Sequence, residues 1–140
     1  MNTLEITKQQ KIASLDSFTR AYLIAALWSS TGDDGEPLDR NYSVRDLSLE
    51  ALDRAIEDCR KFLDSDLTVS DRITNDCLYT GCPSIEYAGH DFWLTRNGHG
   101  CGFWDGNWTE ETGKFLTKIA KSFGETDLYV GDDGELYFSR

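Results

Sequence analysis

The segment Gly89–Gly106, with the sequence GHDFWLTRNGHGCGFWDG, decides which fold class the sequence predicts. Residues 91–96 alternate in side-chain character as a strand does, residues 97–100 have the composition of a tight turn, and residues 101–105 suit a returning strand. An Asn-Gly pair between two aromatic runs is a strong hairpin signal. A second hairpin is expected over residues 127–138, around a turn at 132–134.

Three helices are expected outside these hairpins. Residues 17–30 are apolar almost all round, which is typical of a buried helix. Apolar residues recur at spacings of three and four over residues 49–63, and another such stripe lies between Thr109 and Gly124. The order helix, helix, hairpin, helix, hairpin predicts an α+β fold. In it, a small antiparallel sheet built from two C-terminal hairpins packs against three helices.

The 140 residues are enough for one domain. Residues 1–14 are polar and could form a flexible arm, a short edge strand or a frayed start, while residues 64–88 could be a helical extension or a loop. The loop at 31–39 holds several carboxylates, but their spacing does not fit a calcium loop, and its composition is that of a turn. Gly-Asp-Asp-Gly-Glu occurs at 32–36 and again at 131–135, which we interpret as recurring turn chemistry and not as an internal repeat.

The chain carries 25 acidic and 14 basic side chains, for a formal net charge of −11. Direct binding to nucleic acid through bulk charge is therefore not expected. No apolar run approaches the roughly 18 residues that a membrane span needs, and no signal-peptide pattern opens the chain. These features predict a cytoplasmic protein that does not contact a membrane.

The negative charge is densest in residues 32–76, which hold 13 acidic and 6 basic side chains. Such a face could imitate the phosphates of a nucleic acid and occupy a basic groove of another protein. Asp53, Glu57 and Asp58 are the candidate residues of this acidic surface. The alternative is that these charges only keep the domain soluble, and the arginines interleaved with them favour that view.

Four cysteines are expected to be reduced thiols, because the chain shows no export signal. Cys59 falls on the apolar face of a predicted helix, where a thiol packs as a small hydrophobe. Five side chains could supply ligands to a zinc ion: Cys77, Cys82, His90, His99 and Cys101. Their spacing is irregular and includes no C-x2-C pair, so the sequence predicts neither a metal nor another cofactor.

Three functional interpretations compete for residues 89–106, which hold both histidines of the chain. His99 could act as a general acid or base, oriented by Asp91, Asp105 or His90. The aromatic rings could stack on nucleic-acid bases, but only Arg96 is basic in this segment. The rings could form a partner interface, or they could simply fill the core. The candidate binding residues are Trp93, Arg96, His99, Trp104, Asp105 and Trp108.

Four blocks of the sequence, taken together, resemble a group of known proteins. They are Phe18–Trp28, Pro37–Ser43, Gly89–Gly100 (GHDFWLTRNGHG) and Asp127–Gly134 (DLYVGDDG). As a set they resemble a group of small uncharacterised proteins carried by bacteriophages, prophages and plasmids. The resemblance implies an accessory protein of a mobile element that acts in the bacterial cytoplasm, and it brings no catalytic residues.

The sequence therefore predicts a non-enzymatic accessory protein that binds and inhibits a host bacterial protein. The target could be a nucleic-acid-handling or defence complex that meets the acidic surface. The alternative is a pocket around Arg96, His99 and Asp105 that binds or hydrolyses a small anionic, nucleotide-like ligand. A structural role in an assembly, as a homo-oligomer, is a third hypothesis.

Overall fold

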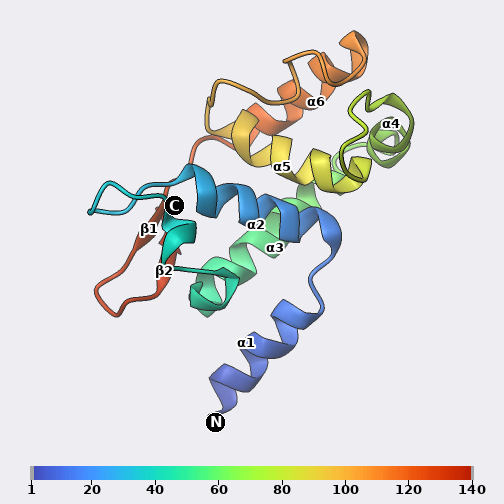
Figure 1. Ribbon diagram of the computed structural model, residues 1–140. Coiled ribbons are helices and arrows are strands. Elements are labelled where there is room, and N and C mark those ends of the chain that lie inside the picture. Colours follow the sequence, from blue (N-terminus) through green and yellow to red (C-terminus); the bar gives the residue numbers. More distant parts are fainter. Residues whose placement is uncertain (1, 140) are drawn as a thin grey trace.

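The computed structural model describes residues 2–139, which form six α-helices, two short 3-10 helices and one two-stranded sheet (Figure 1). The α-helices are α1 (Thr3–Ala13), α2 (Ser17–Ser29), α3 (Leu49–Asp64), α4 (Val69–Asp76), α5 (Ser84–Arg96) and α6 (Glu110–Ser122). The 3-10 helices are η1 (Leu38–Arg40) and η2 (Val44–Asp46), and the strands are β1 (Leu128–Val130) and β2 (Leu136–Phe138). The α+β class is confirmed, with more helices than the three expected.

Helices α2 and α5 pack along each other at the centre of the molecule (Figure 1). Gly89 permits this close approach, since a Cβ atom built there would lie 2.1 Å from the carbonyl oxygen of Phe18 on α2. The rings of Phe18 and Phe92 both stack on Phe62 of α3, with centroids 5.5 and 4.3 Å away. An aromatic cluster thus joins three helices in the core.

Residues 91–96 lie in α5, so the strand predicted there is wrong. Every side chain from Asp91 to Arg96 is buried. A helix buried on all sides has no polar face, and the short run therefore lacks the 3.6-residue period that would identify it.

The Asn-Gly pair that predicted a hairpin turn instead ends α5. Gly98 has a φ of +68°, and its N–H donates to the Thr95 carbonyl at 3.2 Å. The His99 N–H donates to the Leu94 carbonyl at 3.0 Å, which completes a Schellman motif. Residues 101–105 follow in a loop, so the returning strand is also wrong, and the described residues contain one hairpin instead of two.

The C-terminal hairpin is confirmed. Its strands pair antiparallel, with Leu128 opposite Phe138 and Val130 opposite Leu136. Leu136 is fully buried, and its carbonyl accepts a hydrogen bond from the Ser48 N–H at 2.9 Å. The hairpin is therefore anchored at the start of α3.

The two segments without a definite prediction are both largely helical. Residues 3–13 form α1, which buries none of its side chains and is held to the body by ion pairs of Lys8 with Glu135 (3.1 Å) and of Lys11 with Asp53. Residues 64–88 contain α4, a short loop and the first turn of α5.

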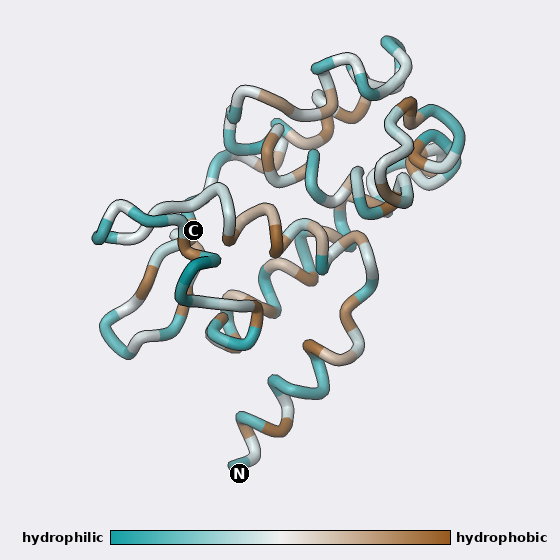
Figure 2. The backbone as a smooth tube through the Cα atoms, in the orientation of Figure 1, coloured by the Kyte–Doolittle hydropathy of each residue, from teal (hydrophilic) through white to brown (hydrophobic). Residues whose placement is uncertain are grey.

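Hydrophobic residues gather along the central helices, whereas the loop that follows α2 and the tip of the hairpin are largely hydrophilic (Figure 2). Within residues 2–139, no helix combines the length and the apolar character that crossing a membrane requires.

Candidate binding site

Arg96 is buried, and its guanidinium group is engaged inside the chain. Nη1 donates to the Tyr22 hydroxyl and to the Asp58 carboxylate, each at 2.9 Å. Nε and Nη2 donate to the backbone carbonyls of Gly124 and Phe123, at 2.8 and 3.1 Å. Arg96 therefore ties α5 to α2, to α3 and to the end of α6, and it offers no exposed donor to a partner or an anionic ligand.

The other five candidate binding residues do not form one site. Trp93 and His99 line a pocket beside the ends of α2 and α5, whereas Trp104 and Trp108 line a second pocket beside α6. Trp93 and Trp108 are buried, and Trp104 is 53% exposed. Asp105 accepts hydrogen bonds from backbone N–H groups of its own loop. The hairpin that would have brought these residues together does not form.

Each carboxylate of the predicted acidic surface on α3 already has a cationic partner. Asp53 pairs with Lys11 of α1, and Asp58 pairs with Arg96. Glu57 pairs with two basic residues of α3, the nearer at 2.6 Å. Basic residues of α1, α3 and α5 thus offset much of the charge of these acids.

The two Gly-Asp-Asp-Gly-Glu segments, residues 32–36 and 131–135, adopt the same turn. In each, the first glycine N–H donates to the glutamate carbonyl, at 2.9 and 2.7 Å. The second aspartate accepts a hydrogen bond from the glutamate N–H, at 3.0 Å in both. The second glycine has a φ of +80° in one and +82° in the other, a conformation that favours glycine. We call these segments the twin loops.

The twin loops carry four aspartates that have no basic nitrogen within 4 Å among residues 2–139: Asp33, Asp34, Asp132 and Asp133. The two glutamates of the loops do pair with basic residues. A hydrogen bond from the Tyr137 hydroxyl lowers the pKa of Asp133, which is therefore ionised at neutral pH. The four aspartates of the twin loops are thus uncompensated, whereas Asp53, Glu57 and Asp58 on α3 are paired.

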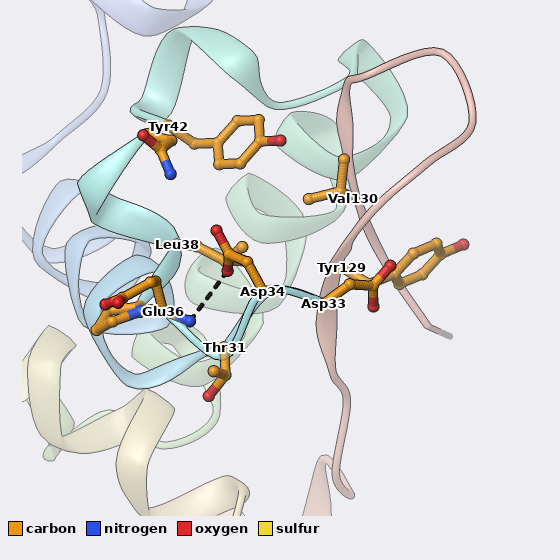
Figure 3. Close-up of a pocket in the computed structure, with 11 residues that line it drawn as sticks. Thr31, Asp33, Asp34, Glu36, Leu38, Tyr42, Tyr129 and Val130 are labelled. Atoms are coloured by element: carbon orange, nitrogen blue, oxygen red, sulfur yellow. Dashed lines mark hydrogen bonds between the residues drawn. The ribbon is translucent and has the colours of Figure 1, made fainter.

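A pocket of about 390 Å³ lies between the first twin loop and strand β1. Figure 3 shows Tyr129 and Val130 on β1, with Tyr42 and Leu38 contributed by the chain that follows the loop. Asp33 is among the acidic residues that line it. The pocket therefore combines aromatic and apolar surface with carboxylates.

His90 and Asp91, which were expected as orienting partners of His99, form a pair with each other. Asp91 is fully buried, lies 3.0 Å from His90 Nδ1, and accepts a hydrogen bond from Trp108 Nε1 at 2.8 Å. Burial raises the pKa of Asp91. The His90 ring stacks between Trp28 and Tyr87, with centroids 5.8 and 5.5 Å away. The adjacent His and Asp in the sequence were the one signal of this pair.

All four cysteines are free thiols, and Cys59 is buried as its helical position predicts. Burial raises the pKa of Cys77, Cys82 and Cys101, so these thiols are neutral at pH 7. In the part of the chain that the structure describes, no three His, Cys, Asp or Glu side chains are grouped so as to hold a metal ion.

No family model, no curated protein and no solved structure matches this chain.

Proposed function

We propose that this chain is a non-enzymatic binding protein that docks a basic surface of another protein on its twin loops. The observation that carries the proposal is the set of four aspartates that lack a basic partner among residues 2–139, while Asp53, Glu57 and Asp58 on α3 are paired. Unpaired carboxylates attract a basic partner more strongly, because no nearby cation cancels their field.

The pocket beside the first twin loop would supply an anchor that charge alone does not. An arginine of the partner could stack its guanidinium group on Tyr42 or Tyr129 and pair with Asp33. Its methylene stem would contact Leu38 and Val130. Arginines buried in such pockets contribute strongly to the affinity of protein interfaces.

The target we propose is a host bacterial protein that handles nucleic acid or belongs to a defence complex. A groove built to hold phosphates is basic, so a surface with four uncompensated aspartates would compete for it. The resemblance to proteins of phages and plasmids supports this setting. Occupation of the groove would inhibit the host protein.

The alternative pocket around Arg96, His99 and Asp105 has less support. The Arg96 guanidinium donates to acceptors within the chain, and its side chain is 1% exposed. An anionic ligand would therefore lose the basic group that was expected to hold it.

Two double variants that each remove two negative charges test the proposal. Asp33→Asn with Asp132→Asn neutralises the twin loops at carboxylates that make no hydrogen bond or ion pair within residues 2–139. Asp53→Asn with Glu57→Gln is the matched control on α3. Tagged proteins are used to capture partners from a bacterial lysate, and the affinity for the captured protein is then measured over a range of salt concentrations.

We expect the twin-loop variant to bind the captured protein about tenfold more weakly at low salt, as two lost surface charge contacts allow. The control should bind as the wild type does, and the difference should shrink as salt rises. Equal losses in the two variants, or an affinity independent of salt, would contradict docking on the twin loops.

A further inference from the structure

We propose that the turn between α3 and α4, together with a hollow beside α6, forms an interface between two copies of this chain related by a two-fold axis. The hollow has a volume of about 390 Å³, and its apolar lining residues are Phe115 and Ile119 of α6. Its polar lining residues are Ser65, Asp66, Lys118 and Ser122. This surface lies at the end of the molecule away from the twin loops (Figure 1). The inference therefore does not depend on the proposed docking function.

Leu67, in the turn, provides the first argument. It is fully exposed. Hydrogen bonds on both sides of it fix the turn: Asp66 Oδ1 accepts from the N–H and the hydroxyl of Thr68, at 2.8 and 2.6 Å, and Ser65 Oγ donates to the Phe62 carbonyl at 2.7 Å. A leucine gains free energy when it leaves water, and a turn that is already ordered loses little entropy on association. The turn is thus built to present an apolar side chain to a partner.

The position of Leu67 beside the hollow makes the surface complementary to itself. Residues 65 and 66, which precede Leu67, line the hollow, and Phe115 and Ile119 are half-buried within it. In a two-fold interface the same patch faces itself, so a projection of one copy meets the hollow of the other, and the contact occurs twice. A hollow of about 390 Å³ accommodates a leucine side chain. Each copy can therefore bury its Leu67 in the hollow of the second copy.

The charges at the hollow provide the second argument. Asp66 and Lys118 both line it, and neither has an ionic partner within 4 Å among residues 2–139. The hydrogen bonds from Thr68 lower the pKa of Asp66, which is therefore ionised at neutral pH. The axis that exchanges Leu67 also brings the turn of one copy to α6 of the other, so that Asp66 can pair with Lys118 of the second copy. A partner of a single sign of charge would leave one of these groups unpaired, whereas a second copy satisfies both.

Sedimentation equilibrium of the full chain tests the interface, over about 1–500 μM protein, a range suited to a small interface. A salt concentration of about 0.15 M screens the repulsion between two chains that each carry a net charge of −11. We expect the wild type to dimerise. Leu67→Asp should raise the dissociation constant about a hundredfold or more, because two leucines leave the interface. Leu78→Asp is the matched control: Leu78 is 59% exposed, does not line the hollow, and should leave the dimer unchanged.

A charge exchange tests the predicted pairing. Asp66→Lys alone and Lys118→Asp alone each place like charges opposite one another twice per dimer, and each should weaken dimerisation about tenfold or more. An equal mixture of the two variants restores opposite charges at both contacts and should form a heterodimer. Lys114→Asp makes the same change one turn earlier on α6, beside Trp104 and outside the hollow, and should dimerise as the wild type does.

Circular dichroism of each variant establishes that it is folded before it is compared. A wild-type chain that remains a monomer over the whole concentration range would overturn the proposal. So would a dimer that Leu67→Asp leaves intact, or folded charge variants whose mixture stays monomeric.

Discussion

Replacing Arg96 with methionine should destabilise the fold by about 3–5 kcal/mol, the range expected when one partner of a buried ion pair is removed. Methionine keeps much of the apolar length of the side chain. It removes the hydrogen bonds to Tyr22, Asp58, Phe123 and Gly124. The substitution therefore tests whether Arg96 stabilises the packing of the helices or serves to bind a ligand.

The magnitude follows from what remains after the substitution. Asp58 is 18% exposed and keeps a longer contact to Arg54, at 3.9 Å, so water and Arg54 would partly compensate it. The Tyr22 hydroxyl is in a residue that is 1% exposed, and it would lose its hydrogen-bond donor. Because domains of this size are stable by about 5–15 kcal/mol, the loss should be a large part of the total.

Urea unfolding followed by tryptophan fluorescence measures this loss. Arg54→Met is the control, because its ion pair with Asp58 is longer and partly exposed and should cost less than about 1 kcal/mol. Arg96→Lys keeps the charge with fewer donors and should fall between the two. If Arg96→Met costs no more than Arg54→Met, the structural role assigned to Arg96 is refuted.

Two further predictions concern α5. Gly89→Ala should lower the free energy of unfolding by more than about 3 kcal/mol, because the added Cβ would lie 2.1 Å from a backbone carbonyl oxygen of α2. Gly100→Ala is the control: its Cβ would meet no atom within 4 Å, so the free energy of unfolding should change by less than about 0.5 kcal/mol. Similar values for the two variants would contradict the close packing of α5 on α2. Burial raises the pKa of Asp91, so its protonated form is favoured in the folded state, and its contribution to stability is present below pH 3.8 and is lost as pH rises through the raised folded-state pKa. Asp91→Asn should therefore remove part of the stability that the wild type loses as the pH rises above 3.8. Unfolding curves of the variant that keep the wild-type pH dependence would show that Asp91 is not the source of this loss.

The helices with a clear period and the C-terminal hairpin could be predicted from the sequence. The stripe of α3 repeats apolar residues at spacings of three and four because one face is buried and the other is solvated. The hairpin could be predicted because its turn, Asp132–Gly134, lies between two short apolar runs. In both elements the local chemistry agrees with the tertiary environment.

The strand predicted at residues 91–96 failed for a physical reason. All side chains of this part of α5 are buried, so it has no polar face. Without a polar face the sequence does not show the 3.6-residue period by which a helix is recognised. Asn97 and Gly98 suit a hairpin turn and a helix C-terminus equally well, because both need a residue that accepts a positive φ. The choice between them is made by the packing of α5 on α2, which a local pattern does not contain.

The excess of acidic side chains could be predicted from the sequence, but which of them remain unpaired in the fold could not. Net charge counts every carboxylate alike, but a carboxylate acts on a partner only where no nearby cation offsets it. Asp53 and Asp33 each contribute one negative charge to the total. In the folded chain Lys11 lies beside Asp53, whereas no basic nitrogen of residues 2–139 lies within 4 Å of Asp33. Residues distant in sequence thus decide which acids remain available.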